Sequence, residues 1–387
     1  MKLKEDNKSV LLFYFSFLIL LFVTFFSRVY VISDICKYLK FIALGMAIVY
    51  FFIQSKTYTL KSFVLLILIG VILVISSYQS KNIDLLSSFL LIASSKNIDF
   101  DKYIKFVFRW SIIFLIFVLL LHFFGCTNDY IDIRPNGVYR SSMGFAHPNT
   151  FGYILMIIAI EYIYIKRDKI KLRNAIVLIP YICIINYFSN SRSSTIVLIM
   201  LMIFIFFQKI FGEKIVYNKI IQFLIKHSFI LLFLFISFGL LLYSKSNEFG
   251  NLLNDLLSKR LYWLNYYVTN YDISLFGQNI EIISLKLANM LNVTYAALDN
   301  VYYYILLNYG VIVFLLIAYA YRKLFEFFYK NHDTIEIILF LLINIYGLFE
   351  KTTIIINLNC FLIMFGIILY NKKKKEGEEC NEKISFV

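Results

Sequence analysis

The run VLLFYFSFLILLFVTFF (residues 10–26) decides the fold class of this chain, because it contains no charged residue and is long enough to cross a membrane. The hydrocarbon core of a bilayer is about 30 Å thick and takes about 20 apolar residues of helix, with a range of about 17 to 25. No small-residue cleavage site follows the run. We therefore interpret it as a retained first span and not as a signal peptide.

The composition of the whole chain agrees with a membrane protein. Of its 387 residues 60% are hydrophobic, and the mean hydropathy is +0.76. A water-soluble core of this length cannot bury so much apolar surface. The sequence therefore predicts an all-α polytopic membrane protein that forms one integral membrane domain over residues 1–387.

We expect twelve transmembrane spans. They lie at 10–26, 39–54, 62–78, 83–95, 106–125, 150–165, 174–189, 194–211, 227–243, 300–320, 335–350 and 354–370. The span at 83–95 is short, and it is included because the basic residues at the N-terminus and those at 166–173 should lie on one side of the membrane. An even number of spans must then separate them.

The basic residues predict the orientation. The net charge is +14, but lysine and arginine cluster between apolar runs and not along one face, which excludes a nucleic-acid-binding protein. Placing most of them in the cytoplasm puts both termini there. The richness in Lys, Asn, Ile, Phe and Tyr is typical of an AT-rich bacterial genome. We therefore expect a multi-pass protein of a bacterial cytoplasmic membrane.

Four segments follow from this topology. They are N-terminal spans over 1–130, a functional core over 131–320 with a large outer loop at 244–299 that carries short amphipathic helices, C-terminal spans over 321–371, and a basic cytoplasmic tail over 372–387.

One outer stretch, GVYRSSMGFAHPNTFG (137–152), gathers polar residues that are rare elsewhere in the chain. Its Pro148 and Asn149 have a simple reading as the start signal of the next helix. Such a cap requires neither the guanidinium of Arg140 nor the imidazole of His147, so these two residues become candidates for function.

Three further outer features have simple readings as well. Arg192 in SNSRSS (189–194) and Arg260 could be interfacial arginines, and Asp299 with Asn300 stands where a helix cap is expected. The segment 251–267 predicts a helix with one apolar face. That face consists of Leu253, Leu256, Leu257, Leu264 and Tyr267, with Trp263 suited to the membrane interface.

Taken together, these features resemble the bacterial O-antigen ligase and polymerase superfamily over about residues 130–320. In chain order the resemblance rests on Arg140, Gly144-Phe145, Pro148-Asn149 and Gly152, then Ser191-Arg192, Arg260 with Trp263, Leu275-Phe276-Gly277, and Asp299-Asn300 followed by Gly310. It implies a fold similar to that of the GT-C membrane glycosyltransferases. Ligases of the superfamily commonly have histidine at the position of Asp299, so the polymerase branch is favoured.

The resemblance implies a reaction on the outer face of the membrane. An oligosaccharide repeat unit leaves undecaprenyl diphosphate and is joined, with inversion, to a second lipid-linked unit. Arg192 and Arg260, then Arg140, would stabilise the leaving diphosphate. Asp299, or else His147, would accept the proton of the attacking hydroxyl.

The same resemblance assigns the remaining residues and partners. Asn149 and Asn300 would hold sugar hydroxyls, while Trp263 and Tyr302 would stack on sugar or isoprenoid. We expect no cofactor and no metal, because the acidic residues of the outer loops are dispersed. The partners would be the lipid-linked donor and acceptor, membrane lipid, and possible chain-length regulator and flippase proteins.

Two alternatives stay open from the sequence. One is a ligase of the same superfamily. The other is a flippase or secondary transporter, which would place ionisable residues near the middle of the membrane. Glu161, Glu336 and Glu350 lie toward the ends of their expected spans, which favours the enzyme.

Overall fold

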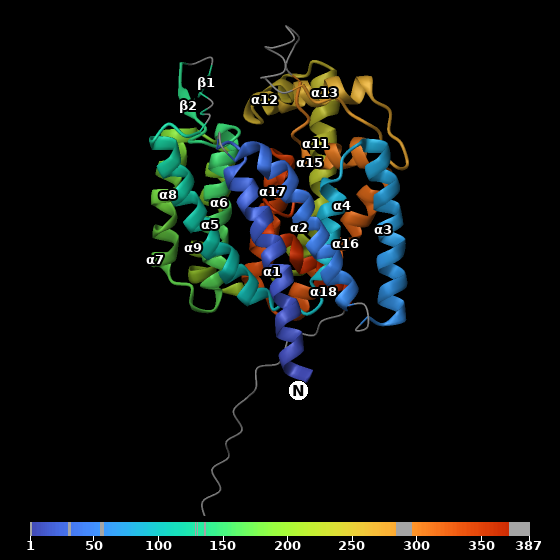
Figure 1. The fold of residues 1–387 in the computed structure, drawn as a ribbon. Helices are drawn as coiled ribbons and strands as arrows, with labels where there is room; N and C mark the ends of the chain where they lie inside the picture. The colour runs from blue at the N-terminus through green and yellow to red at the C-terminus, as the bar shows by residue number, and fades with distance from the viewer. Residues whose placement is uncertain are drawn as a thin grey trace, which may run out of the picture.

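The computed structural model describes residues 2–29, 32–54, 58–127, 129, 131–134, 137–283 and 296–370, with side chains from residue 9 onward. The predicted basic tail at 372–387 and the part of the outer loop at 284–295 lie outside these residues. Helices dominate the described chain, and most of the long ones run along a common direction (Figure 1).

The first third of the chain is helical. It contains α1 (Lys2–Phe26), α2 (Ser33–Gln54), α3 (Leu60–Ser80), α4 (Asp84–Ser94) and α5 (Phe100–Phe123). Local signals set several ends: Asp99 caps α5 by accepting a hydrogen bond from the backbone N–H of Lys102 at 3.1 Å. α3 ends at Lys81, which has a left-handed φ of 52°.

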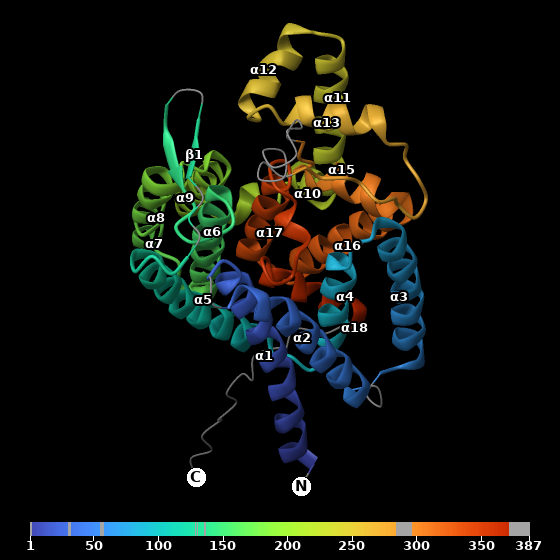
Figure 2. The ribbon, with the colours of Figure 1, turned by 45° about the horizontal axis from the view of Figure 1, so that its top comes forward.

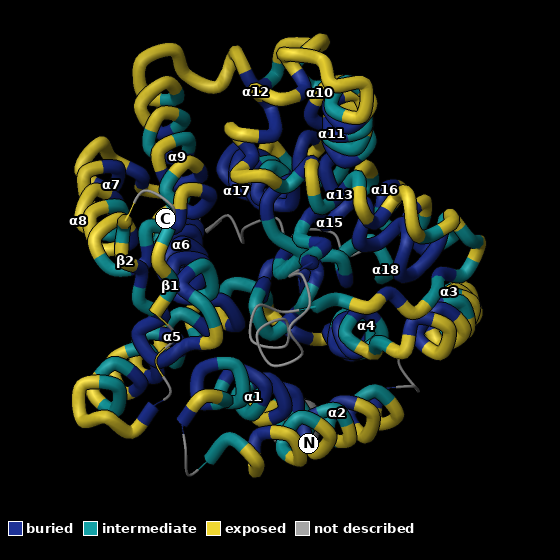
Figure 3. The backbone as a smooth tube through the Cα atoms, turned by 90° about the horizontal axis from the view of Figure 1, so that it is seen from above, coloured by how far each residue is buried: buried dark blue, intermediate teal, exposed yellow. Residues whose placement is uncertain are grey.

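A short hairpin and a second group of helices follow. The strands β1 (Ile131–Ile133) and β2 (Tyr139–Ser141) are antiparallel, with Asp132 opposite Arg140. After them come α6 (Pro148–Ile165), α7 (Leu172–Ile176), α8 (Leu178–Ile184), the π-helical turn η3 (Ile185–Ser189) and α9 (Arg192–Phe211). In α6, 78% of the residues are buried, against 22% of an 18-residue apolar stretch in α2 and in α3, so α6 lies inside the bundle (Figure 3).

The last part begins with two helices joined at a sharp bend. α10 (Lys219–Lys226) and α11 (Ser228–Ser244) meet at an angle of 74°. They are followed by α12 (Glu248–Leu256), α13 (Arg260–Asn270), α15 (Val301–Tyr304), the π-helical turn η5 (Ile305–Tyr309), α16 (Gly310–Lys330), α17 (Thr334–Tyr346), the 3-10 helices η6 (Lys351–Ile354) and η7 (Cys360–Phe365), and α18 (Gly366–Tyr370).

The two ends of the bundle differ. One end carries β1, β2, α12 and α13, and we call it the hairpin end (Figure 2). The opposite end carries the basic segment 166–173 and is called the basic end.

The membrane character of the chain agrees with the prediction, but the number of spans is supported only in part. Among the described residues, eight helices are long and apolar enough to cross a membrane, and the bent pair α10–α11 makes a ninth. The other three expected spans fall on shorter apolar helices, α4, α17 and η7–α18. Helices of 11 and 13 residues, as α4 and α17 are, reach only about 16 to 20 Å. Twelve spans therefore stay a prediction.

The amphipathic segment of the outer loop is two helices and not one. Ser258 and Lys259 both have left-handed φ values, 56° and 66°, which end α12 and turn the chain into α13. Leu253, Leu257, Leu264 and Tyr267 are buried as the pattern predicts, whereas Leu256, the last residue of α12, is 65% exposed.

The outer loop contacts the tenth expected span through two glycines, Gly277 in the loop and Gly310 in the span. Gly277 and Gly310 have φ values of 86° and 89°, and their backbones touch: a Cβ on Gly310 would lie 2.4 Å from the nitrogen of Gly277. Beside them, the N–H of Val311 donates to the carbonyl of Ser274 at 3.0 Å. Only glycine combines this conformation with this close approach.

Candidate functional site

The centre of the candidate site is Glu350, which follows α17 at the hairpin end. Its Oε1 accepts a hydrogen bond from Asn149 Nδ2 at 2.8 Å and another from Arg260 Nη2 at 2.9 Å. The side chains of Glu350 and Arg260 are only 12% and 13% exposed. This carboxylate therefore joins the start of α6 to the start of α13.

Arg140 extends the connection to the hairpin. Its Nη1 pairs with Asp132 Oδ2 at 2.8 Å, its Nε donates to the carbonyl of Ser189 at 2.8 Å, and its Nη2 donates to Asn149 Oδ1. Because the residue is only 6% exposed, these three contacts hold it in place. We call the connected set Asp132, Arg140, Asn149, Glu350 and Arg260 the Glu350 network.

Arg260 is also fixed by the backbone. Its Nε donates to the carbonyl of Phe349 at 2.7 Å and its Nη1 to that of Leu257 at 3.2 Å. Together with the bond to Glu350, three of its five N–H donors bind described residues, and the other two have no partner among them. Burial lowers the pKa of Arg260, but Glu350 and Asp299 outweigh it, so the pKa lies above its ordinary value and the charge is retained.

Asp299 is brought beside the network by its neighbours. Asn300 caps α15 by accepting from the N–H of Tyr303 at 3.1 Å, and its Nδ2 donates to the carbonyl of Leu348 at 3.2 Å. Asp299 is half-buried, and its carboxylate makes no hydrogen bond or ion pair with any residue that the structure describes. Burial and the Asp299 charge raise the pKa of Glu350 above its ordinary value.

Two more arginines lie near the network. Arg192 is the first residue of α9, is exposed, and has no hydrogen bond or ion pair within the described part of the chain. Arg134 donates from Nη2 to the carbonyl of Asn190 at 2.8 Å. Burial, with the positive charges of Arg140, Arg192 and Arg260, lowers the pKa of Arg134 to about 10. Four guanidinium groups therefore act on one region of the hairpin end.

His147 has a local task that the sequence reading did not assign to it. It is the N-cap of α6, and its Nδ1 accepts from the N–H of Asn149 at 3.1 Å. The imidazole itself therefore makes the cap that the sequence assigned to Pro148 and Asn149 alone. Burial and the nearby Arg140 lower the pKa of His147 to about 4, so the ring is neutral near pH 7.

The two predicted stacking residues lie in different surroundings. Trp263 is half-buried on α13, with its ring centroid 4.8 Å from that of Tyr262. Tyr302 is fully buried, and its hydroxyl donates to the carbonyl of Asn344 at 2.7 Å. Tyr302 therefore belongs to the helix core and presents no ring surface to a substrate.

Sequence reasoning missed Glu350, Asp132, Arg134 and Lys351 as members of the site. The Lys351 ammonium lies 4.6 Å from the centre of the Tyr304 ring, and burial lowers its pKa against the opposing effect of Asp299. A signal existed for Glu350 and Lys351, because an acidic and a basic residue stand together between two apolar runs. Asp132 and Arg134 carried no such signal.

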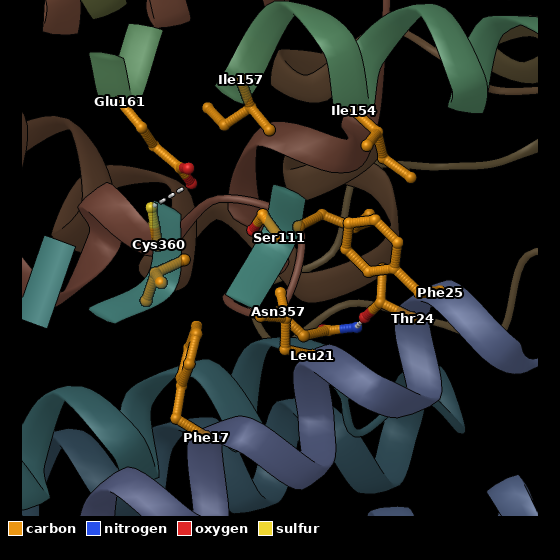
Figure 4. Close-up of a pocket in the computed structure, with 12 residues that line it drawn as sticks. Phe17, Leu21, Thr24, Phe25, Ser111, Ile154, Ile157, Glu161, Asn357 and Cys360 are labelled. Atoms are coloured by element: carbon orange, nitrogen blue, oxygen red, sulfur yellow. Dashed lines mark hydrogen bonds between the residues drawn. The ribbon is translucent and has the colours of Figure 1, made fainter. Parts of the chain in front are cut away.

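Another polar spot lies inside the bundle, and none of its residues belongs to the Glu350 network (Figure 4). Cys360 Sγ lies 3.2 Å from Glu161 Oε1, and the other oxygen of Glu161 has no hydrogen-bond partner among the described residues. The cavity beside them has a volume of about 10 Å³, close to what one water molecule needs.

The arrangement at the hairpin end joins an exposed guanidinium, a half-exposed carboxylate and a rigid frame of paired charges. Such a set can bind an anionic group and orient or deprotonate a hydroxyl. Within the described residues, no three His, Cys, Asp or Glu side chains gather closely enough to hold a metal ion. Comparisons of the chain with protein-family models, with curated proteins and with solved structures find no match.

Proposed function

We propose that this chain is a polysaccharide polymerase of the bacterial cytoplasmic membrane. It joins undecaprenyl-diphosphate-linked repeat units on the outer face, forms a glycosidic bond and releases undecaprenyl diphosphate. The observation that carries the proposal is that charged residues from distant segments meet at the hairpin end. Arg260 and Asp299 act on one buried carboxylate, Glu350, while Arg192 and Arg260 both act on Arg134.

In this proposal the arginines have unequal roles. Arg192 has no partner among the described residues, so it makes the first contact with the diphosphate. Arg260 offers its two remaining donors from a fixed position. Arg140 and Asn149 position the start of α6, because their side chains are used within the Glu350 network. Charge on the leaving group is stabilised best by donors that are already oriented.

Asp299 is the proton acceptor in this scheme. A carboxylate at the site can take or orient the proton of the attacking sugar hydroxyl. His147 is a weaker candidate, because its Nδ1 is used by the backbone and its pKa is lowered to about 4. The reaction then breaks the bond between the anomeric carbon and the diphosphate oxygen and forms one bond to the acceptor oxygen.

The test is glycan length in a deletion strain complemented with variants. Arg192→Ala and Asp299→Asn should each reduce chain extension at least about 100-fold, as losses of oriented charge do in other active sites. The matched control is Arg28→Ala, because Arg28 is also exposed at the hairpin end, has no ion pair in the described chain and lies outside the Glu350 network. Normal polymer from both variants, at normal protein level, would contradict the proposal.

The strain also separates the alternatives. Loss of a polymerase leaves single repeat units at the surface, while loss of a ligase leaves polymer on undecaprenyl diphosphate. A flippase or transporter is a second candidate because of Glu161, an ionisable group 2% exposed inside the bundle with one unpartnered oxygen among the described residues. Loss of a flippase would trap repeat units in the inner leaflet, and Glu161→Gln would then abolish export.

A further inference from the structure

An apolar groove runs along the lipid-facing flank of the bundle, at the half nearest the basic end. One wall consists of Leu172, Ile176 and Ile179 from α7 and α8, and the other of Met202, Ile203 and Phe206 from α9. Its volume is about 380 Å³. Figures 1 and 3 place α7, α8 and α9 together at this flank, with the outward faces of α7 and α8 exposed.

The groove is lined by apolar side chains on both walls. Leu172 and Ile176 lie one turn apart on α7, and Ile179 continues the wall on α8. Ala175, the smallest of the lining residues, also faces the groove. Ile176 is 61% exposed and Phe206 is 50% exposed, so the described chain leaves these walls uncovered.

The end of the groove at the basic end is positively charged. Lys171 and Arg173 flank Leu172, and Lys209 lies in the last turn of α9, one turn beyond Phe206. All three basic residues are exposed, and none forms an ion pair with a described residue. By contrast, the neighbouring Arg167 is held by Asp101 at 2.8 Å and Glu336 at 3.0 Å.

We propose that the groove binds one acyl chain of an anionic phospholipid, with its phosphate held by Lys171, Arg173 and Lys209. An apolar slot combined with a cluster of unpaired basic residues at its end matches the two parts of such a lipid. A neutral lipid would fill the slot but leave the basic cluster without a counter-charge. The site lies in the opposite half of the bundle from the Glu350 network and is independent of the proposed reaction.

The test is native mass spectrometry of the purified full-length protein with phosphatidylglycerol and phosphatidylcholine of identical acyl chains. The wild type should retain phosphatidylglycerol selectively. Lys171→Gln with Arg173→Gln should weaken that binding roughly 30-fold, since each basic residue near an anionic lipid contributes about a factor of five. Ile176→Trp should abolish it by filling the slot, and the exposed position tolerates the larger side chain.

The matched control is Lys105→Gln with Arg109→Gln. These residues are exposed near the start of α5, which supplies no wall of the groove. The control should bind phosphatidylglycerol as the wild type does. Equal retention of both lipids, or unchanged phosphatidylglycerol binding in Ile176→Trp, would overturn the proposal. A dimer that Ile176→Trp dissociates would assign the groove to a second copy of the chain and would overturn it as well.

Discussion

At the scale of single residues, the site depends on a few charges that are buried together. Glu350 has neighbours of both signs: Arg260 donates to it, while Asp299 repels it. Removing one partner of a buried ion pair leaves the other charge uncompensated, which costs far more than the pair itself contributes. The Glu350 network should therefore be sensitive to any single substitution.

The first prediction concerns Glu350 and Arg260. Glu350→Ala and Arg260→Ala should each lower the free energy of unfolding by about 3 to 5 kcal/mol, and the double variant should lose much less than the sum. Thermal unfolding in detergent measures this cycle. The control pair Asp255 and Lys259 is 65% and 67% exposed, and its removal should leave the unfolding midpoint unchanged. Additive losses at Glu350 and Arg260 would show that the two are not coupled.

The second prediction concerns pH and His147. Its pKa is about 4 in the folded protein and about 6.5 when unfolded, so the unfolded chain binds the proton first. The stability contributed by the neutral ring is complete above about pH 6.5 and is lost as the pH falls toward 4, by up to about 3 kcal/mol.

Unfolding midpoints at pH 7.5 and pH 4.5 measure this effect. In His147→Asn the side chain can still cap α6, but it does not titrate. The difference between the two midpoints should therefore shrink in the variant. An equal difference in wild type and variant would assign the pH dependence to other groups.

At the scale of elements, close backbone contacts and helix irregularities position the site. The two π-helical turns, η3 and η5, both lie at the hairpin end, and such turns occur often at functional sites. η3 ends with Ser189, whose carbonyl accepts from Arg140, and η5 is followed by Gly310. Gly152 allows α6 to approach this region, because a Cβ there would lie 2.5 Å from the Cβ of Ser191.

The third prediction tests the contact between Gly277 and Gly310. Alanine at Gly277 would place its Cβ 2.1 Å from the carbonyl oxygen of Asn308 and would be strained at φ 86°. Gly277→Ala should therefore destabilise the protein by at least about 2 kcal/mol. Gly45→Ala is the control, because no atom lies within 4 Å of a Cβ there. In a helix interior it should be neutral or stabilising, by about 0.5 to 1 kcal/mol. Equal stability of the two variants would refute the close contact.

At the scale of the whole molecule, the bundle separates two chemistries. The hairpin end carries the Glu350 network, and the basic end carries exposed lysine and arginine beside an apolar groove. α6 lies between these ends inside the bundle, with 78% of its residues buried. The proposed reaction would use the hairpin end, and the proposed lipid site would use the basic end.

The fourth prediction is the orientation of this bundle. Reporter domains fused after Ser141 and after Lys169 should report opposite sides of the membrane, with Ser141 outside, because basic residues concentrate in cytoplasmic loops. At each position, one reporter that is active only outside the cytoplasm and one that is active only in the cytoplasm show on which side of the membrane the position lies. A cytoplasmic signal at Ser141 would contradict both the topology and the proposed reaction.

The class of protein and the position of the long spans could be predicted from the sequence, and so could local helix signals such as Pro148 and Asn300. A membrane-spanning helix makes its backbone hydrogen bonds within itself and faces lipid with its own apolar residues. A single apolar stretch of sequence is therefore enough to predict it. The break between α12 and α13 could not be predicted, because the apolar pattern continues through Ser258 and Lys259 and their φ values do not follow from it.

The composition of the candidate site was decided only by the tertiary structure. Residue type and predicted membrane side identify Arg140, Asn149, Arg260 and Asp299 in the sequence, whereas Glu350 stands at the end of an expected span and receives no role there. Its partners Asn149 and Arg260 lie 201 and 90 positions away along the chain. Apolar pattern and spacing describe neighbours within a few turns, whereas a buried carboxylate is stabilised by whichever donors the packing of distant helices brings to it.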